Sequence, residues 1–258
     1  MKRKIVGVLS VLLCFCMLCS CDNLNKANVE AAIGNKPIIA VLSDSDELLA
    51  SEKFSEKIGG DIVRYNLTSD AVVAVLNGKA DYVVLNEYES QEFIDAGNEL
   101  ELVECADYKI EYVAWFDADN LQLKNEFNKA LKDLKNTGVI EKIKEANKQG
   151  GEYTYHNVTP SKGELVMICD PLFDNILYYS DSGEVCGTDY DIAKAVCNRL
   201  GYTLRIEVVD FDEIFNSLEA GEGDFVMSAT QYSAERAEFF IASDVYSTLN
   251  FNVYKRAK

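Results

Sequence analysis

The sequence predicts an α/β protein built from two lobes, and three observations support this prediction. Short apolar runs typical of buried strands alternate with segments of helical spacing along most of the chain. The 258 residues are 48% hydrophobic, which is enough apolar material for one or two buried cores. The segment 75–84 is echoed at 218–227, where each copy reads as a helix that ends at a glycine and turns into a buried strand. Two similar lobes would produce this echo.

Residues 37–146 read as one alternating half of the chain. The strand predictions rest on apolar runs such as PIIAVL and ADYVVL, and the helix predictions rest on amphipathic spacing. The predicted strands are 37–42, 61–66, 80–85, 100–104 and 110–116, and the predicted helices are 46–58, 70–77, 87–96, 120–134 and 139–146.

A linker and a second alternating half follow. Residues 147–162 (NKQGGEYTYHNVTPSK) contain glycine, proline and many polar residues, which predicts a connection without regular structure. The predicted strands are 165–169, 203–209, 224–228 and 246–255, the predicted helices are 191–200 and 212–220, and a hairpin is predicted through 181–183.

The charge balance excludes several classes of function. The chain has 43 acidic against 25 basic residues, for a net charge of −18, whereas binding to a nucleic-acid backbone depends on clustered Lys and Arg. A single histidine argues against His-based zinc sites and Ser-His-Asp chemistry. No Walker loop, metal-ligand cluster or dinucleotide fingerprint is visible, so neither a cofactor nor a metal is expected.

The first twenty residues read as an export signal. Lys2, Arg3 and Lys4 precede an uncharged run, 5–20, that is too short for a comfortable membrane span. The sequence Leu-Cys-Ser-Cys that ends at Cys21 resembles a bacterial lipoprotein box, which implies that Cys21 is lipidated and is the first mature residue. A transmembrane helix and an ordinary signal are the alternatives. Residues 21–36 are predicted to be a polar tether, with the protein on the extracellular or periplasmic face of the membrane.

Four cysteines remain in the predicted folded part: Cys105, Cys169, Cys186 and Cys197. In an exported protein they can form up to two disulfides, but their spacing does not fix the pairing. Buried free thiols that act as small hydrophobic side chains are the alternative.

The second half carries recognisable motifs. Residues 187–195 (GTDYDIAKA), 218–224, 228–236 (SATQYSAER) and 243–246 (SDVY) are collinear and closely spaced. They resemble motifs of the bacterial extracellular solute-binding proteins of the polar amino-acid family, family 3. The resemblance implies a two-lobed periplasmic-binding-protein fold of type II with a hinge, and a protein that binds without catalysis.

The two halves stand in an unusual order. Residues 37–146 resemble the half that comes second in this family, so the chain resembles a circularly permuted member. The alternative is a fragment of a tandem protein. The implied organisation is lobe 2 at 37–107, a hinge return strand and helices on lobe 1 at 108–146, the linker, and lobe 1 at 163–258.

The resemblance also implies ligand-binding residues on lobe 1. Arg236 matches the arginine that binds a ligand carboxylate, and a guanidinium can hold a carboxylate bidentately. Its alternative is a surface arginine paired with Glu235 or Glu238. The other matched positions are Ser233, Gln231 and Ala229 near the arginine, Asp170 for a ligand ammonium, and Phe173 for an apolar stem.

Lobe 2 departs from the family pattern. The positions that normally begin a helix and accept a carboxylate align with Asp44, Ser45 and Asp46. Like charges there would repel an anion, although Asp46 also suits a helix N-terminus. The amine-binding aspartate aligns with the neutral Asn86, which is followed by Glu87.

Three functions therefore remain open. The leading hypothesis is a lipid-anchored solute-binding protein that presents an amino acid, a related amine or a peptide to the permease of an ABC importer. The second is a degenerate binding fold that acts as a surface sensor or interaction protein. The third is a dehydratase-like enzyme, for which Glu87 is the only candidate acid.

Overall fold

The computed structural model describes residues 36–148, 151, 153–155, 160–173 and 175–258. The predicted signal, the lipidation site Cys21 and all but the last residue of the predicted tether lie outside the described residues. Among the described residues, no helix has both the length and the apolar character to cross a membrane.

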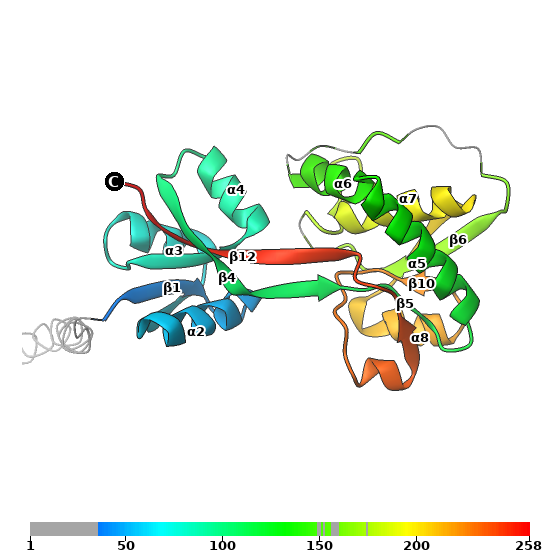
Figure 1. Cartoon of the computed structure of the whole chain (residues 1–258), viewed down its shortest axis with the longest axis horizontal. Helices are drawn as coiled ribbons and strands as arrows, with labels where there is room; N and C mark the ends of the chain where they lie inside the picture. Colours follow the sequence, from blue (N-terminus) through cyan, green and yellow to red (C-terminus); the bar gives the residue numbers. More distant parts are fainter. Residues whose placement is uncertain (1–35, 149–150, 152, 156–159, 174) are drawn as a thin grey trace, which may run out of the picture.

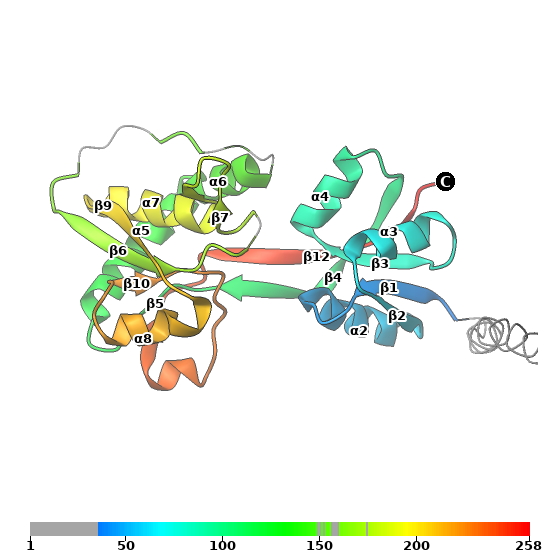
Figure 2. The same cartoon turned by 180° about the vertical axis from the view of Figure 1, so that it is seen from behind.

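Two α/β lobes lie side by side, each with its own five-stranded sheet (Figures 1 and 2). The sheet of lobe 2 has the strand order β2-β1-β3-β12-β4, in which β1 pairs in parallel with both β2 and β3. Its strands are β1 (Ile38–Leu42), β2 (Asp61–Tyr65), β3 (Tyr82–Asn86), β4 (Leu100–Tyr112) and β12 (Ser247–Arg256), and its helices are α2 (Asp46–Ile58), α3 (Thr68–Leu76) and α4 (Glu87–Asp95).

Lobe 1 is built around a second sheet of order β11-β5-β10-β6-β9. Strand β6 pairs in parallel with β9 and β10, and β5 runs antiparallel between β10 and β11. Its strands are β5 (Trp115–Asp117), β6 (Glu164–Cys169), β9 (Thr203–Val208), β10 (Phe225–Val226) and β11 (Phe240–Ala242), with a small hairpin of β7 (Tyr178–Tyr179) and β8 (Val185–Cys186). Its helices are α5 (Leu121–Asn136), α6 (Val139–Lys148), α7 (Thr188–Leu200) and α8 (Ile214–Glu219), and two short 3₁₀ turns, η1 (Phe211–Glu213) and η2 (Arg236–Glu238), precede α8 and β11.

Two long strands connect the lobes. Strands β4 and β12 form an antiparallel pair that extends from Leu100 opposite Arg256 to Tyr112 opposite Ser247. Both strands reach from lobe 2 toward lobe 1 (Figure 1). The chain therefore enters lobe 1 after β4 and returns from it at β12, so this pair is the connection about which the lobes can move.

The structure differs from the sequence prediction at both of these strands. The runs 100–104 and 110–116 were expected as separate strands, but residues 100–112 form the single strand β4. The polar residues between the two runs stay extended because β4 pairs with β12. The last strand was expected within lobe 1, at 163–258, yet β12 pairs with β3 and β4 in the sheet of lobe 2. Its side chains Phe251 and Val253 are fully buried there. The three-residue strand β11 was not predicted.

Tyr155, in the predicted linker, bonds to helix α7 of lobe 1. The Tyr155 hydroxyl is 2.6 Å from Oδ1 of Asp191 and 2.9 Å from the Asp191 carbonyl oxygen, and its ring lies 4.7 Å from the Lys194 ammonium. Asn147 donates to the other carboxylate oxygen of Asp191 at 2.8 Å. The last turn of α6 and the middle of its connection to β6 are thereby bonded to α7.

Within the described part of the chain, none of the four cysteines of the folded part forms a disulfide. Cys169 and Cys197 are fully buried, and burial raises the pKa of each to about 12. They behave as small core side chains, which is the free-thiol alternative of the sequence prediction.

Candidate functional site

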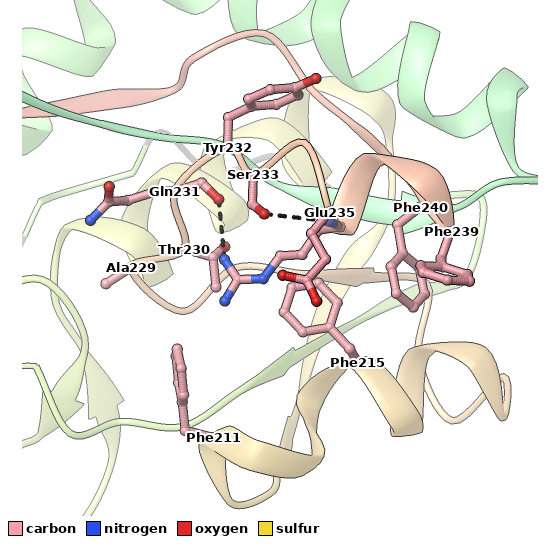
Figure 3. Close-up of a pocket in the computed structure, with 11 residues that line it drawn as sticks. Phe211, Phe215, Ala229, Thr230, Gln231, Tyr232, Ser233, Glu235, Phe239 and Phe240 are labelled. Atoms are coloured by element: carbon pink, nitrogen blue, oxygen red, sulfur yellow. Dashed lines mark hydrogen bonds between the residues drawn. The ribbon is translucent and has the colours of Figure 1, made fainter.

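A pocket of about 570 Å³ lies on lobe 1. The loop that follows β10 supplies one wall, and Phe211 and Phe215 rise toward that loop from η1 and α8 (Figure 3). The pocket is lined by Phe211, Phe215, Ala229, Thr230, Gln231, Tyr232, Ser233, Glu235, Arg236, Phe239 and Phe240. Four of the predicted ligand-binding residues, Ala229, Gln231, Ser233 and Arg236, are thus brought together.

Arg236 is held by an aromatic ring and a carbonyl group. Its guanidinium carbon lies 4.8 Å from the centre of the Phe215 ring, and its Nη1 donates to the Gln231 carbonyl oxygen at 3.3 Å. Within the described part of the chain it forms no ion pair, so the alternative of a pair with Glu235 or Glu238 is not observed. The ring fixes the plane of the guanidinium, which leaves its other N–H groups for an incoming acceptor.

Ser233 supports the short turn that carries the arginine. Its Oγ accepts a hydrogen bond from the backbone N–H of Arg236 at 3.4 Å, as a serine at the start of a helical turn does. Figure 3 shows the Ser233 and Gln231 bonds as dashed lines.

Asp170 and Phe173 lie next to the pocket and act on it through Phe211. Asp170 is buried, and its Oδ2 accepts the backbone N–H of Phe211 at 2.9 Å. The Phe173 ring makes an edge contact with the Phe211 ring at a centroid distance of 5.7 Å. These two residues therefore position an aromatic wall of the pocket.

The predicted residues of lobe 2 lie at the C-terminal ends of its parallel strands. Ser45 and Asp46 follow β1, and Asn86 ends β3. The Ser45 hydroxyl donates to the Leu42 carbonyl oxygen at 3.0 Å. The Asn86 side chain accepts the N–H groups of Tyr88 and Glu89 at 3.0 Å, so it caps α4.

Acidic side chains occupy the space between the first turns of α2 and α4. Glu47 is only 6% exposed and accepts the Asn86 side-chain amide at 3.0 Å. Burial and the neighbouring Glu47 raise the pKa of Glu89 to about 7, although Thr68 donates to it at 3.0 Å. Burial and Glu47 also raise the pKa of Asp46. A protein carboxyl thus stands where two helix N-termini would favour an anion.

The parallel strands of the two sheets have their C-terminal ends on the sides of the lobes that face each other. Figure 1 shows β1 running toward lobe 1 and β6 running toward lobe 2. Between these ends the Tyr88 hydroxyl and the Thr188 Oγ1 are 3.3 Å apart, one from each lobe. In open α/β sheets, ligands bind outside the carboxyl ends of the strands, so both sets of predicted residues lie on the appropriate side of their lobes.

Glu87, the candidate catalytic acid, is engaged at the hinge. Its Oε1 accepts both the backbone and the side-chain N–H of Asn250, at 3.2 and 3.1 Å, and lies 3.9 Å from the Lys144 ammonium. Lys144 also donates to the Thr248 carbonyl oxygen at 3.1 Å. Glu87 and Lys144 therefore bind β12, and the Glu87 carboxylate is used in these contacts rather than in the pocket.

Comparisons with known proteins match the part of the chain that carries the pocket. Residues 165–258 match the model of the bacterial extracellular solute-binding proteins, family 3. This match covers less than half of the chain. The arginine-binding extracellular protein ArtP of Bacillus subtilis (strain 168) is 28% identical over 78 residues, which cover 30% of this chain and 31% of the relative. The membrane-bound lytic murein transglycosylase F of Sodalis glossinidius is 32% identical over 80 residues, covering 30% of this chain and 17% of that protein. The chain thus spans less than a third of these relatives.

Solved structures similar to this chain include an ancestral cationic amino acid solute-binding protein, at 11% identity and a TM-score of 0.45. That comparison covers 86% of this chain and 82% of the other. The unliganded, open L-cystine solute receptor of Neisseria gonorrhoeae is 23% identical, with a TM-score of 0.29 over 31% of this chain and 34% of the receptor.

Sequence reasoning missed the aromatic part of the pocket. Phe211 and Phe215 are four residues apart at the start of the α8 region, so both face the same side, and this spacing is the signal that would have found them. Phe239 follows η2 directly, and Phe240 begins β11, a strand of three residues that is too short for a periodic pattern to predict which way its side chains point.

We predict that Glu89 makes the stability depend on pH. Because the pKa of Glu89 in the folded state, about 7, lies above its ordinary value of 4.5, ionising it costs more in the folded than in the unfolded chain. The free energy of unfolding should therefore fall between about pH 5 and 8. Glu89→Gln should reduce that fall by about 1–2 kcal/mol, measured by denaturant unfolding across this range. Glu92→Gln, an exposed acid on the same helix, is the matched control, and an equal fall in wild type and Glu89→Gln would refute the assignment.

Proposed function

We propose that the protein is an extracellular solute-binding protein that closes its two lobes on a small polar solute. The observation that carries the proposal is the oriented Arg236, which forms no ion pair with any described residue, in an aromatic pocket on the side of lobe 1 that faces lobe 2. A guanidinium fixed in this way binds a carboxylate with two parallel hydrogen bonds.

The facing sides of lobe 1 and lobe 2 favour opposite charges on the solute. Arg236 on lobe 1 attracts an anionic group, whereas Asp46 and Glu47 on lobe 2 disfavour one and attract a cation. A solute with a carboxylate at one end and an ammonium group at the other can bind Arg236 on lobe 1 and the acids on lobe 2. An amino acid, a short peptide or a related amine has this chemistry.

Closure needs only contacts that exist when the lobes are together. A solute bound to lobe 1 alone gains the lobe 2 contacts on closure. Because the solute then binds the closed form more tightly than the open form, it increases the fraction of molecules that are closed. The β4–β12 pair supplies a connection that can bend, since its ladder is irregular between Asn250 and Asn252 and again between Val253 and Tyr254.

The cellular setting forms the second part of the proposal. Lipidation at Cys21 would hold the protein at the membrane surface, and the permease of an ABC importer would receive the closed form. The family match at 165–258 and the basic and apolar leader support export. The reversed order of the halves stays a prediction of circular permutation, with a tandem fragment as the alternative.

A surface sensor without transport is the second candidate function. The acids at Asp46 and Glu47, where a ligand anion would otherwise bind at a helix N-terminus, favour it. An enzymatic role is less well supported, because Glu87 is used by Asn250 and Lys144.

The direct test is thermal unfolding of the full chain in mild detergent against L-arginine, other amino acids, polyamines and short peptides. A bound solute should raise the unfolding midpoint, because ligands of the folded state stabilise it by mass action. Arg236→Ala should increase the Kd about 10-fold to 100-fold, as expected for the loss of charge-assisted hydrogen bonds.

Arg199→Ala is the matched control, since Arg199 is an exposed arginine of lobe 1 that pairs with Asp133 at 3.1 Å outside the pocket. This variant should bind like the wild type. A panel without effect on a protein that unfolds cooperatively would contradict solute binding and favour the sensor.

Lipidation is tested separately by replacing the proposed anchor. Cys21→Ser should abolish incorporation of labelled palmitate in bacterial cells and release the protein from the membrane fraction. Cys19→Ser, two residues earlier, should leave both unchanged. Labelling that survives in Cys21→Ser would place the modification elsewhere.

A further inference from the structure

One buried acid on lobe 1 stands directly behind the pocket. Asp189, in the first turn of α7, is fully buried, and its Oδ2 accepts the backbone N–H of Ala229 at 2.8 Å. Ala229 lines the pocket. The acid therefore contacts the pocket loop from the buried interior of lobe 1.

The bond holds a backbone conformation that alanine rarely adopts. Ala229 has a φ of +50°, in the left-handed region that is unfavourable for residues with a Cβ. Such a conformation is strained and persists only where the surroundings enforce it. The Asp189 carboxylate is the group that enforces it at the Ala229 N–H.

The residues on either side of Ala229 are anchored independently of Asp189. The Ser228 hydroxyl bridges the backbone N–H and carbonyl of Asp170, at 3.0 and 3.1 Å, and the Thr230 hydroxyl donates to the Val113 carbonyl oxygen at 3.1 Å. Loss of the Asp189 bond would therefore leave the loop attached while freeing Ala229, which lines the pocket between these two anchors.

The Asp189 carboxylate has no cationic partner in the described surroundings. The titratable groups around it are Tyr246 before β12, Tyr112 on β4, Tyr88 on α4 and Cys169 on β6, whose pKa values its charge helps to raise. Asp170, beside Cys169, adds a further negative charge. Burial raises the pKa of Asp189 to about 7, against the smaller opposing effects of the Ala229 N–H and the Tyr246 hydroxyl. The Tyr246 hydroxyl lies beside Asp189, but neither it nor Oδ1 completes a hydrogen bond with a described residue.

We propose that Asp189 is a positioning residue of the solute pocket: its ionised carboxylate keeps Ala229 in the binding conformation, and its protonation loosens the pocket loop. A carboxylate that accepts an N–H forms a stronger bond than a neutral carboxyl, so the loop is ordered when the acid is ionised. Solute affinity then rises with pH near neutrality. The effect on solute affinity rests on the proposed function, whereas the effect on the pocket loop can be measured without any solute.

The test measures the Ala229 amide without any solute. Hydrogen exchange of the full chain, corrected for the intrinsic exchange rate at each pH, reports how often the Asp189–Ala229 bond opens. The protection of the Ala229 amide should rise about tenfold or more between pH 6 and 8.5 in the wild type. In Asp189→Asn the amide keeps a neutral acceptor, so its protection should be low and independent of pH.

Asp191→Asn is the matched control, because Asp191 is a buried acid on the same helix that bonds Tyr155 and Asn147 instead of the pocket loop. It should keep the pH dependence of the wild type. Constant protection of Ala229 in the wild type across this range would overturn the proposal, even if Asp189→Asn failed to fold.

L-arginine serves as the binding probe in a second arm. If it binds, its Kd should decrease as pH rises through 7 in the wild type and stay constant in Asp189→Asn. Pocket-loop protection that depends on pH without any solute binding would contradict the proposed function and leave the role of Asp189 in the loop supported.

Discussion

The pairing of β4 with β12 is the constraint on which the rest of the molecule depends. The two strands are separated by more than 130 residues in the sequence, yet they lie side by side in the sheet of lobe 2 and carry the chain to and from lobe 1. Both ends of lobe 1 are thereby fixed to one edge of the other sheet. Glu87 and Lys144 fasten β12 near the crossing, where both side chains are 18% exposed. The orientation of the two sheets, with strand ends facing each other, follows from this connection.

The residues of the pocket are held in place by their neighbours. Its loop is anchored by hydroxyl groups on Ser228 and Thr230, and its one left-handed alanine is held by the buried Asp189. The arginine is held by Phe215. Ala229 and Arg236 are therefore oriented before a solute arrives, which keeps part of the cost of ordering the site out of the binding step. Lobe 2 contributes charge instead, through acids at the N-termini of α2 and α4.

The sequence was most informative where local patterns decide the structure. Helix α2 was predicted at its observed bounds, since a glycine C-cap and amphipathic spacing mark it, and the motif at 228–236 identified four residues that line one pocket. It was least informative where distant pairing decides. Neither the continuity of β4 nor the membership of β12 in lobe 2 can be read from either segment alone, because each depends on the other. The role of Asp189 was hidden for the same reason, as its partner Ala229 lies forty residues away.

The central claim is that the lobes close on a solute held by Arg236, and a distance across the opening measures it directly. Leu49 and Leu172 are exposed and follow the C-terminal ends of β1 and β6, so spin labels on Leu49→Cys and Leu172→Cys, with Cys105→Ser, report the separation of the facing edges. The distance should shorten when an equimolar mixture of free amino acids is added, and it should stay unchanged in the same protein with Arg236→Ala. An unchanged distance in a protein whose unfolding midpoint the mixture raises would contradict the account.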